Sequence, residues 1–550
     1  MSLDSIPILT IVTFLPLLGA IAVAIAPDTA ARPIALGFAV ATFVVSLFLL
    51  VGYLPGHPGF QFTERVDWIP IFGIQYKLGA DGLSVALVVL TTLMSWISIL
   101  ASFKPIQTRI KEYMISFLVL EVGLIGVFLA LDTFLFYIFW EIVLVPMYLI
   151  IGIWGGVNRI YATIKFVLYT LVGSLLMLVA ILATAYAYQA GHPDTGWVGA
   201  FDFEALRTYA ATGGFADGLQ VLAFVAFFLA FAIKVPMFPF HTWLPDAHTE
   251  APTAGSVMLA AIMLKLGAYG FIRFAVPLYP AAAETFAPVI IVLSLIAIIY
   301  GAIVALVQPD LKRLVAYSSV SHMGFVTLGI FVFTQQGLQG AILQMINHGL
   351  ITGALFLLVG VIYERTHDRT IAKMGGLSAR MPVYAAVFGF FAFASAGLPG
   401  LSGFVGEFLT LLGTFEANPY AAAIATFVMI LAAGYLLFMF QRIFFGEVSD
   451  FFTSLGDHLT DMTPVEILTL VPIGTLVVIF GLQPGLLLNL FSSTVSDTQA
   501  AVGGSAAIPV DPVVVVAGVT IAVVLVLARI GWALSRPRAA ALQPEGGAAH

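Results

Sequence analysis

The sequence predicts an all-α polytopic membrane protein with about 14–15 transmembrane helices and two inverted five-helix repeats, each containing one broken helix. Three observations predict this fold class: the composition, a series of long apolar runs, and two runs that are interrupted by Gly and Pro. Of the 550 residues, 61% are hydrophobic and only 9% are charged. Soluble domains are about 45–50% apolar. A soluble fold has no way to hide so much apolar surface, so the chain is expected to lie in a bilayer.

About 20 apolar residues cross a bilayer as a helix. This rule predicts fifteen spans, at 4–26, 33–53, 81–102, 114–131, 133–153, 162–187, 220–240, 252–277, 286–307, 313–333, 339–362, 382–414, 420–443, 464–487 and 512–534. The first run lacks the basic start and small-residue cleavage site of a signal peptide, and it is interpreted as a spanning helix. The loops are too short for an independent soluble domain.

Lysine and arginine are distributed unevenly among the loops, which predicts an orientation. The basic loops 104–111, 158–160, 310–313 and 364–380 all fall on one side if the N-terminus is outside the cell. Loops on the opposite side are acidic or neutral. The basic loops are therefore expected in the cytoplasm, and an odd number of spans places the C-terminus there too.

Two apolar runs are interrupted, and their spacing indicates an internal repeat. Pro236 and Pro239 break the seventh span, and a Gly/Pro cluster at 397–403 breaks the twelfth. Paired interruptions of this kind indicate a translocation site in membrane transporters. Because a five-helix unit has an odd number of spans, its second copy starts from the opposite face. The predicted parts are 1–110 (N-terminal helices), 111–280 (first repeat), 281–445 (second repeat) and 446–550 (C-terminal helices, with an extra span near 512–534).

Ionisable residues inside apolar runs are functional candidates because they are costly at membrane depth. The candidates are Glu121, Glu141, Lys234, Lys265, His322, His348 and Glu407. The alternative for Lys234 is a side chain that reaches the interface, and Lys265 lies too near mid-span for that. His322 and His348 are candidate proton relays or simply satisfied core groups. Glu407 is alternatively an interfacial carboxylate, and Glu121 has no evident partner.

A glutamate and a lysine that meet and separate can load and unload a proton. Unit charges about 4 Å apart interact by ~4 kcal/mol at an effective dielectric constant of ~20. Moving one proton against 100 mV takes ~2.3 kcal/mol. The interaction energy of a contact between Glu141 and a lysine is therefore large enough to drive the transport of one proton. The alternative is a static ion pair that holds helices together.

The loop after the seventh span carries His241, Asp246, His248 and Glu250. Their spacings fit no common zinc motif. We predict a polar loop that covers the broken helix. In the alternative interpretation, Asp246 and Glu250 help to deliver protons into the membrane.

Several stretches resemble the antiporter-like membrane subunits of NADH-quinone oxidoreductase (respiratory complex I). They are FWEIVLVPMYLIIGIWGG, FAIKVPMFPFHTWLPDAHTEAPTAG, DLKRLVAYSSVSHMGF, INHGLITGALFLLVG and AGLPGLSGFVGEF. The resemblance covers about residues 80–490. Glu407, at a position where the L and N types usually carry lysine, favours the bacterial M type. The family implies fourteen helices in two inverted repeats, so the span at 512–534 departs from it.

The resemblance also implies roles and partners. It implies that Glu141 and Lys234 form a switching pair, that Lys265 is the central relay, and that His322 and His348 continue the path to Glu407. It places NADH, FMN, the iron–sulfur clusters and the quinone on other subunits, and the chain contains no cysteine that could hold a cluster. The expected partners are other membrane-arm subunits, including the L and N types, in the lipid bilayer of the bacterial plasma membrane; no nucleic acid is expected.

The expected function is proton translocation by a membrane-arm subunit, driven by quinone reduction elsewhere in the complex. Besides a solute transporter, for which the sequence shows no substrate-sized polar pocket, two stronger alternatives remain. One is a subunit of a multisubunit sodium/proton antiporter, which shares these motifs. The other is a structural membrane subunit that conducts nothing.

Overall fold

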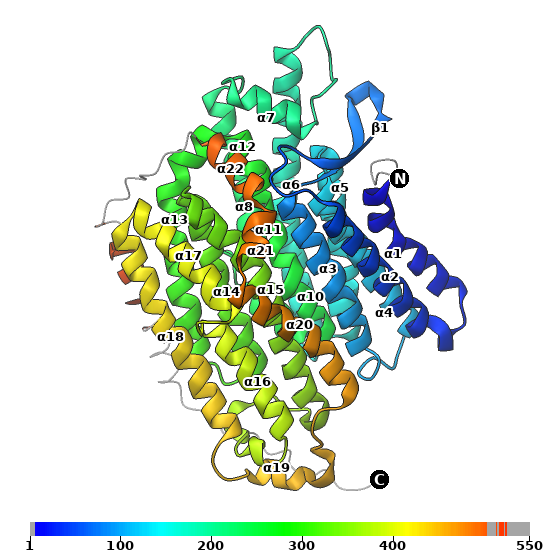
Figure 1. Cartoon of the computed structure of the whole chain (residues 1–550), viewed down its shortest axis with the longest axis vertical. Coiled ribbons are helices and arrows are strands. Elements are labelled where there is room, and N and C mark those ends of the chain that lie inside the picture. Colours follow the sequence, from blue (N-terminus) through cyan, green and yellow to red (C-terminus); the bar gives the residue numbers. More distant parts are fainter. Residues whose placement is uncertain (1–5, 503–512, 514–515, 522, 525–527, 529–550) are drawn as a thin grey trace, which may run out of the picture.

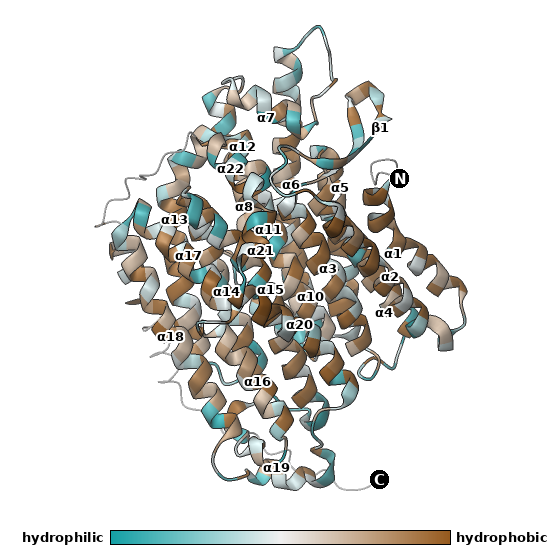
Figure 2. Ribbon diagram, viewed as in Figure 1, coloured by the Kyte–Doolittle hydropathy of each residue, from teal (hydrophilic) through white to brown (hydrophobic). Residues whose placement is uncertain are grey.

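The structure is a computed structural model that describes residues 6–502, 513, 516–521, 523–524 and 528. Long helices run side by side along the molecule (Figure 1), and their ribbons are mostly hydrophobic between more hydrophilic ends (Figure 2). The helices are α1 (Ile8–Ile25), α2 (Ala31–Gly52), α3 (Gly82–Ala101), α4 (Ile110–Leu129), α5 (Thr133–Trp154), α6 (Arg159–Gly191), α7 (Phe203–Ala211), α8 (Asp217–Lys234), α9 (Trp243–Glu250), α10 (Thr253–Met258), α11 (Leu264–Gly270), α12 (Val276–Leu278), α13 (Pro280–Leu306), α14 (Leu311–Phe331), α15 (Gln335–Thr366), α16 (Pro382–Ser395), α17 (Ser402–Ala417), α18 (Pro419–Phe444), α19 (Asp450–Leu455), α20 (Pro464–Leu482), α21 (Gly485–Leu490) and α22 (Ser492–Ala501). The strands are β1 (Gln61–Ile69) and β2 (Ile74–Ala80).

The predicted all-α membrane fold is confirmed. Within the described residues, thirteen helical segments are long and apolar enough to cross a membrane. The predicted span 382–414 is the additional one, and it is divided between α16 and α17. The predicted span 512–534 lies largely outside the described residues. The division into inverted repeats and C-terminal helices stays a prediction.

An antiparallel hairpin of β1 and β2 lies at one end of the helices, and the sequence analysis did not predict it. Its Glu64 carboxylate accepts the backbone N–H groups of Leu9 and Thr10 at 2.8 and 3.0 Å. The first N–H groups of a helix have no partner within the helix. The hairpin therefore caps α1 and holds the N-terminal helix to the rest of the bundle.

The four loops predicted to be cytoplasmic meet at one end of the molecule. They contribute Pro105, Asn158, Lys312 and Arg369 to the wall of one cavity of about 410 Å³. The start of α1 and the hairpin lie at the opposite end (Figure 1). The basic loops thus lie on one face and the start of α1 on the other, as the predicted topology requires.

Asp132 joins the hairpin to the start of α5. Its carboxylate accepts the N–H groups of Phe134 and Leu135 and, from the hairpin, that of Gln75. The side chain is buried, and burial raises the pKa of Asp132 to about 7. Loss of its proton therefore places a desolvated charge between two structural elements.

Asp132→Asn should flatten the dependence of stability on pH. Because the pKa is raised, the folded protein binds a proton that the unfolded chain has released, so stability falls as pH rises from about 4 to about 7, by at most ~1.4 kcal/mol per pH unit. Asparagine keeps an acceptor for the helix cap and has no charge. The apparent melting temperature of the detergent-solubilised protein at several pH values checks this, and an unchanged slope in the variant would contradict it.

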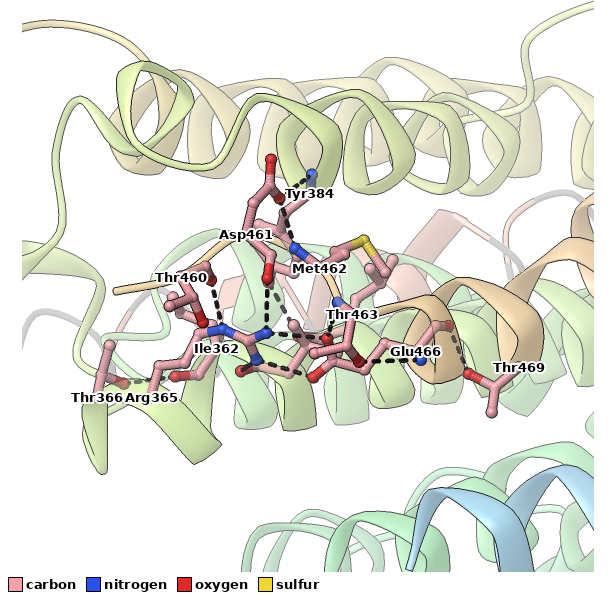
Figure 3. Close-up of polar contacts among 12 residues, drawn as sticks. Ile362, Arg365, Thr366, Tyr384, Thr460, Asp461, Met462, Thr463, Glu466 and Thr469 are labelled. Atoms are coloured by element: carbon pink, nitrogen blue, oxygen red, sulfur yellow. Dashed lines mark hydrogen bonds and ion pairs between the residues drawn. The ribbon is translucent and has the colours of Figure 1, made fainter. Parts of the chain in front are cut away.

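Arg365 fastens the last turn of α15 to the segment before α20 (Figure 3). Its guanidinium donates to the backbone oxygens of Thr460 and Asp461, and it forms two hydrogen bonds of 2.9 Å with the Glu466 carboxylate. The Asp461 side chain accepts the N–H groups of Val383 and Tyr384 at the start of α16. One buried arginine therefore joins α15, α16 and α20.

Glu466→Gln should destabilise the protein by about 3 kcal/mol, because it leaves the buried guanidinium without a counter-charge. The matched control is Glu447→Gln, at an exposed glutamate near the same end of the bundle. The apparent melting temperature and the amount of protein in the membrane measure the effect. Equal values for the two variants would show that the ion pair does not hold this end together.

Candidate functional site

Lys234 is the last residue of α8, where the first predicted interruption begins. Its side chain is 1% exposed, and its ammonium lies over the rings of Trp140 and Phe166, 5.4 and 5.5 Å from their centroids. The indole N–H of Trp243, in α9, donates to the Ile233 carbonyl at 2.8 Å. The break thus exposes one carbonyl that a tryptophan satisfies, and the lysine beside it rests on aromatic faces.

Glu141 follows Trp140 on α5. Its carboxylate therefore lies in the same helix turn as the indole ring that contacts the Lys234 ammonium. Glu141 acts electrostatically on Lys234, but no ion pair within 4.0 Å joins the two in the described part of the chain. Its Oε1 is buried and receives no hydrogen bond from described residues. The predicted switching pair therefore consists of neighbours that are apart here, and their switching stays a prediction.

Lys265 lies on α11 between two π-helical turns, Leu259–Met263 and Phe271–Ala275. It is 0% exposed, and its ammonium donates to the Ala260 carbonyl at 2.5 Å and lies 2.7 Å from Nδ1 of His348. Single π-helical turns are frequent at functional sites because they change which groups a helix presents. The sequence predicted the buried lysine but not these turns.

His348, His322 and Glu407 continue the path from Lys265. The centroids of the two imidazole rings lie 6.1 Å apart, and Nδ1 of His322 is 2.5 Å from Oε1 of Glu407. The amide of Gln344 donates to the same oxygen at 3.0 Å. Four predicted residues from α11, α15, α14 and α17 thus form one connected, buried polar row.

His322 also has polar neighbours that sequence reasoning missed. Its Nε2 lies 3.3 Å from the hydroxyls of both Ser395 and Tyr435. Together with Gln344, these are neutral polar side chains in apolar helices. A charge at membrane depth is conspicuous in a sequence, whereas a buried hydroxyl or amide is common there and gives little signal.

The remaining candidates lie outside the connected row. His248 stacks on Phe356, with ring centroids 4.6 Å apart, and it feels the charges of Lys265 and Lys312. His241 packs against Phe238 and Tyr300.

Two carboxylates that the sequence left open have different surroundings. Asp246 forms ion pairs with Lys165 at 2.8 Å and Arg313 at 3.2 Å, which ties α9 to α6 and α14. Glu121 is fully buried beside Ser95, and neither carboxylate oxygen has a hydrogen bond of standard geometry from the described residues.

A family model described as "NADH:quinone oxidoreductase/Mrp antiporter, TM" matches residues 130–432, which contain the whole polar row. The chain belongs to this family. It is also 51% identical to NADH-quinone oxidoreductase subunit M of Rhodobacter capsulatus, over 89% of this chain and 96% of that relative. It is 43% identical to NADH-ubiquinone oxidoreductase chain 4 of Chondrus crispus, over 88% of this chain and 95% of that relative.

Two solved structures are similar to this chain in fold. A chain of respiratory complex I from Thermus thermophilus is similar with a TM-score of 0.80 and 32% identity, over 90% of this chain and 100% of that chain. A chain of the Mrp complex from Dietzia has a TM-score of 0.76 and 20% identity, over 92% of this chain and 100% of that chain, and this likeness shows the fold alone. The protein is therefore a multi-pass membrane member of the family.

Gly267→Ala should destabilise the contact between α8 and α11, the helices that carry Lys234 and Lys265. A Cβ at Gly267 would lie 2.5 Å from the Phe231 carbonyl oxygen, so one backbone has to move. We expect a loss of about 1–3 kcal/mol. The control is Gly434→Ala on α18, where a Cβ meets nothing within 4 Å. Equal melting temperatures for the two variants would contradict the tight contact.

Proposed function

We propose that this chain is the M-type, proton-translocating membrane-arm subunit of a bacterial NADH-quinone oxidoreductase. The observation that carries the proposal is the buried row Lys265–His348–His322–Glu407, in which neighbouring groups are in hydrogen-bonding or ring contact. Each member can hold or release a proton. A membrane interior excludes such groups unless they serve transport or are paired.

Lys234 and Glu141 form the loading end in this proposal. When the carboxylate approaches the ammonium, the pair favours the charged lysine. When they separate, as here, the desolvated ammonium releases its proton more readily. The released proton moves to Lys265 once Lys265 has given up its own proton, because an ammonium accepts no further proton. The Lys265 helix packs tightly against that of Lys234 at Gly267.

Lys265 gives its proton to His348, the only acceptor nitrogen that the described residues place within hydrogen-bonding distance of its ammonium, and thereby becomes able to accept the proton from Lys234. Transfer continues from His348 to His322 and from His322 Nδ1 to Glu407 Oε1. Since the two imidazole rings are 6.1 Å apart, this step needs a side-chain movement or a bridging water. The Glu407 carboxyl finally releases the proton on the far side.

In the assembly we propose, the basic loops face the cytoplasm and the N-terminus lies outside the plasma membrane. The partners are other membrane-arm subunits, including those of the L and N types. NADH, flavin, iron–sulfur clusters and quinone belong to other subunits. Relatives at 42–51% identity bear the name subunit M, which favours this proposal over a sodium/proton antiporter.

Lys265→Ala should reduce NADH-driven proton pumping by more than roughly tenfold, because it removes the proton donor to His348 at the start of the row. A barrier increase of ~1.4 kcal/mol already corresponds to a tenfold loss of rate. Lys234→Ala and Glu141→Gln should act in the same direction. Pumping is measured by a pH-sensitive dye in sealed membrane vesicles that contain the whole complex, together with quinone reductase activity.

The matched control is Lys104→Ala, at an exposed lysine in a loop. It should leave pumping at the level of the parent protein. If the Lys265 and Lys234 variants assemble normally and retain both pumping and quinone reductase activity, the chain is a structural subunit and the proposal is wrong. Sodium-dependent proton exchange without NADH would instead indicate an antiporter.

A further inference from the structure

Gln344 lies on α15, one helical turn before His348, and both face the buried row. The Gln344 side chain donates from Nε2 to Oε1 of Glu407 at 3.0 Å, and the residue is 3% exposed. His322 contacts the same carboxylate oxygen. Two groups of different chemistry, one titratable and one neutral, therefore share a single carboxylate oxygen.

The other end of the Gln344 amide has no partner. Its Oε1 is buried and receives no hydrogen bond from the part of the chain that the structure describes. This oxygen lies against Gly406, where a Cβ would approach it to 2.6 Å. The glycine before Glu407 thus lets the amide lie directly on α17, and an unsatisfied acceptor remains beside the carboxyl group.

A carboxylate only accepts hydrogen bonds, whereas a carboxylic acid also donates one. A primary amide offers both functions, and rotation about its terminal bond by half a turn exchanges them. When Glu407 takes a proton from His322, the deprotonated Nδ1 accepts from the new O–H. The O–H needs a second acceptor when it turns away from His322 to release the proton. The unpaired Oε1 of Gln344 belongs to the residue that already holds Glu407.

We propose that Gln344 is a positioning residue that binds both protonation states of Glu407, donating its N–H to the carboxylate and accepting from the carboxylic acid after its amide rotates. This inference rests on the proposed function. In the transfer step, the Nδ1–H bond of protonated His322 breaks and an O–H bond forms on Glu407. His322 and Glu407 are then both neutral. Loss of the proton from Glu407 restores the carboxylate and the present amide orientation.

The groups around Glu407 come from the helices packed on α17, and they make this role separable from charge effects. The charged or titratable ones are His322 on α14 and Tyr435 on α18, which interacts electrostatically with Glu407. Gln344 on α15 is neutral. Removing its amide therefore changes hydrogen bonding to the carboxylate and leaves every titratable neighbour in place.

The test is Gln344→Met, which preserves length and volume without hydrogen bonding. Gln344 binds both forms of Glu407, but its hydrogen bond to the charged carboxylate is stronger than one to the neutral acid. Its loss should therefore move the acid limb of the pumping pH profile to higher pH by about half a unit to one unit. The measurement is NADH-driven pumping by the assembled complex in sealed vesicles across the acid and neutral range. Gln339→Met, at a half-buried glutamine of the same helix, is the control and should leave the profile unchanged.

An acid limb that superimposes on that of the parent protein would overturn the inference. If Gln344→Met does not assemble, Gln344→Asn replaces it with the same expectation, because its amide is one methylene too short to reach Glu407. Glu407→Gln separates the two proposals. If it abolishes pumping while the Gln344 variants have the parent profile, only the inference fails. If it leaves pumping intact, the proposed function fails as well.

Discussion

The contact between the Lys265 ammonium and the His348 imidazole is the interaction on which the buried polar row depends. An ammonium that is fully inside the protein, at membrane depth, requires acceptors, and it finds a backbone carbonyl and one ring nitrogen. Lys265 lies on α11, which packs against the helix of Lys234, and His348 lies on α15. Without this contact, Lys265 would be separated from His322 and Glu407.

Two chain breaks position Lys234, which lies outside the row, and Glu407, which ends it. At the first break, α8 stops at Lys234, and Trp243 satisfies the carbonyl that the break exposes. At the other, α16 and α17 are joined by a turn in which Gly397 and Gly400 have φ of +80° and +95°, a conformation that favours glycine. Asn347 donates to Ser402 O at the start of α17. Polar side chains replace the helical hydrogen bonds that each break removes.

The spans and the charged members of the row could be predicted from the sequence. A helix must contain a long apolar run to cross the hydrocarbon of a bilayer, and charged residues are rare within such a run. The β1–β2 hairpin could not, since it contains no apolar run of spanning length. The π-helical turns around Lys265 were hidden because an extra residue in a turn leaves no compositional mark. Gln344 was missed for a related reason: an uncharged amide in an apolar helix has many ordinary explanations, and only its contact with Glu407 distinguishes it.

Glu407 and Lys234 differ in how the protein holds their charges, and this asymmetry follows from the residues that surround them. Glu407 receives direct hydrogen bonds, whereas Lys234 rests on two aromatic faces while Glu141 stays out of ion-pair range. A desolvated cation–π contact is worth about 2 kcal/mol, so two such contacts approach the ~4 kcal/mol of an ion pair about 4 Å long. The two states of the pair then differ by less than the ~2.3 kcal/mol that moves one proton against 100 mV. Aromatic support therefore keeps the separated state of this pair near enough in energy to the paired state for a modest driving force to exchange them.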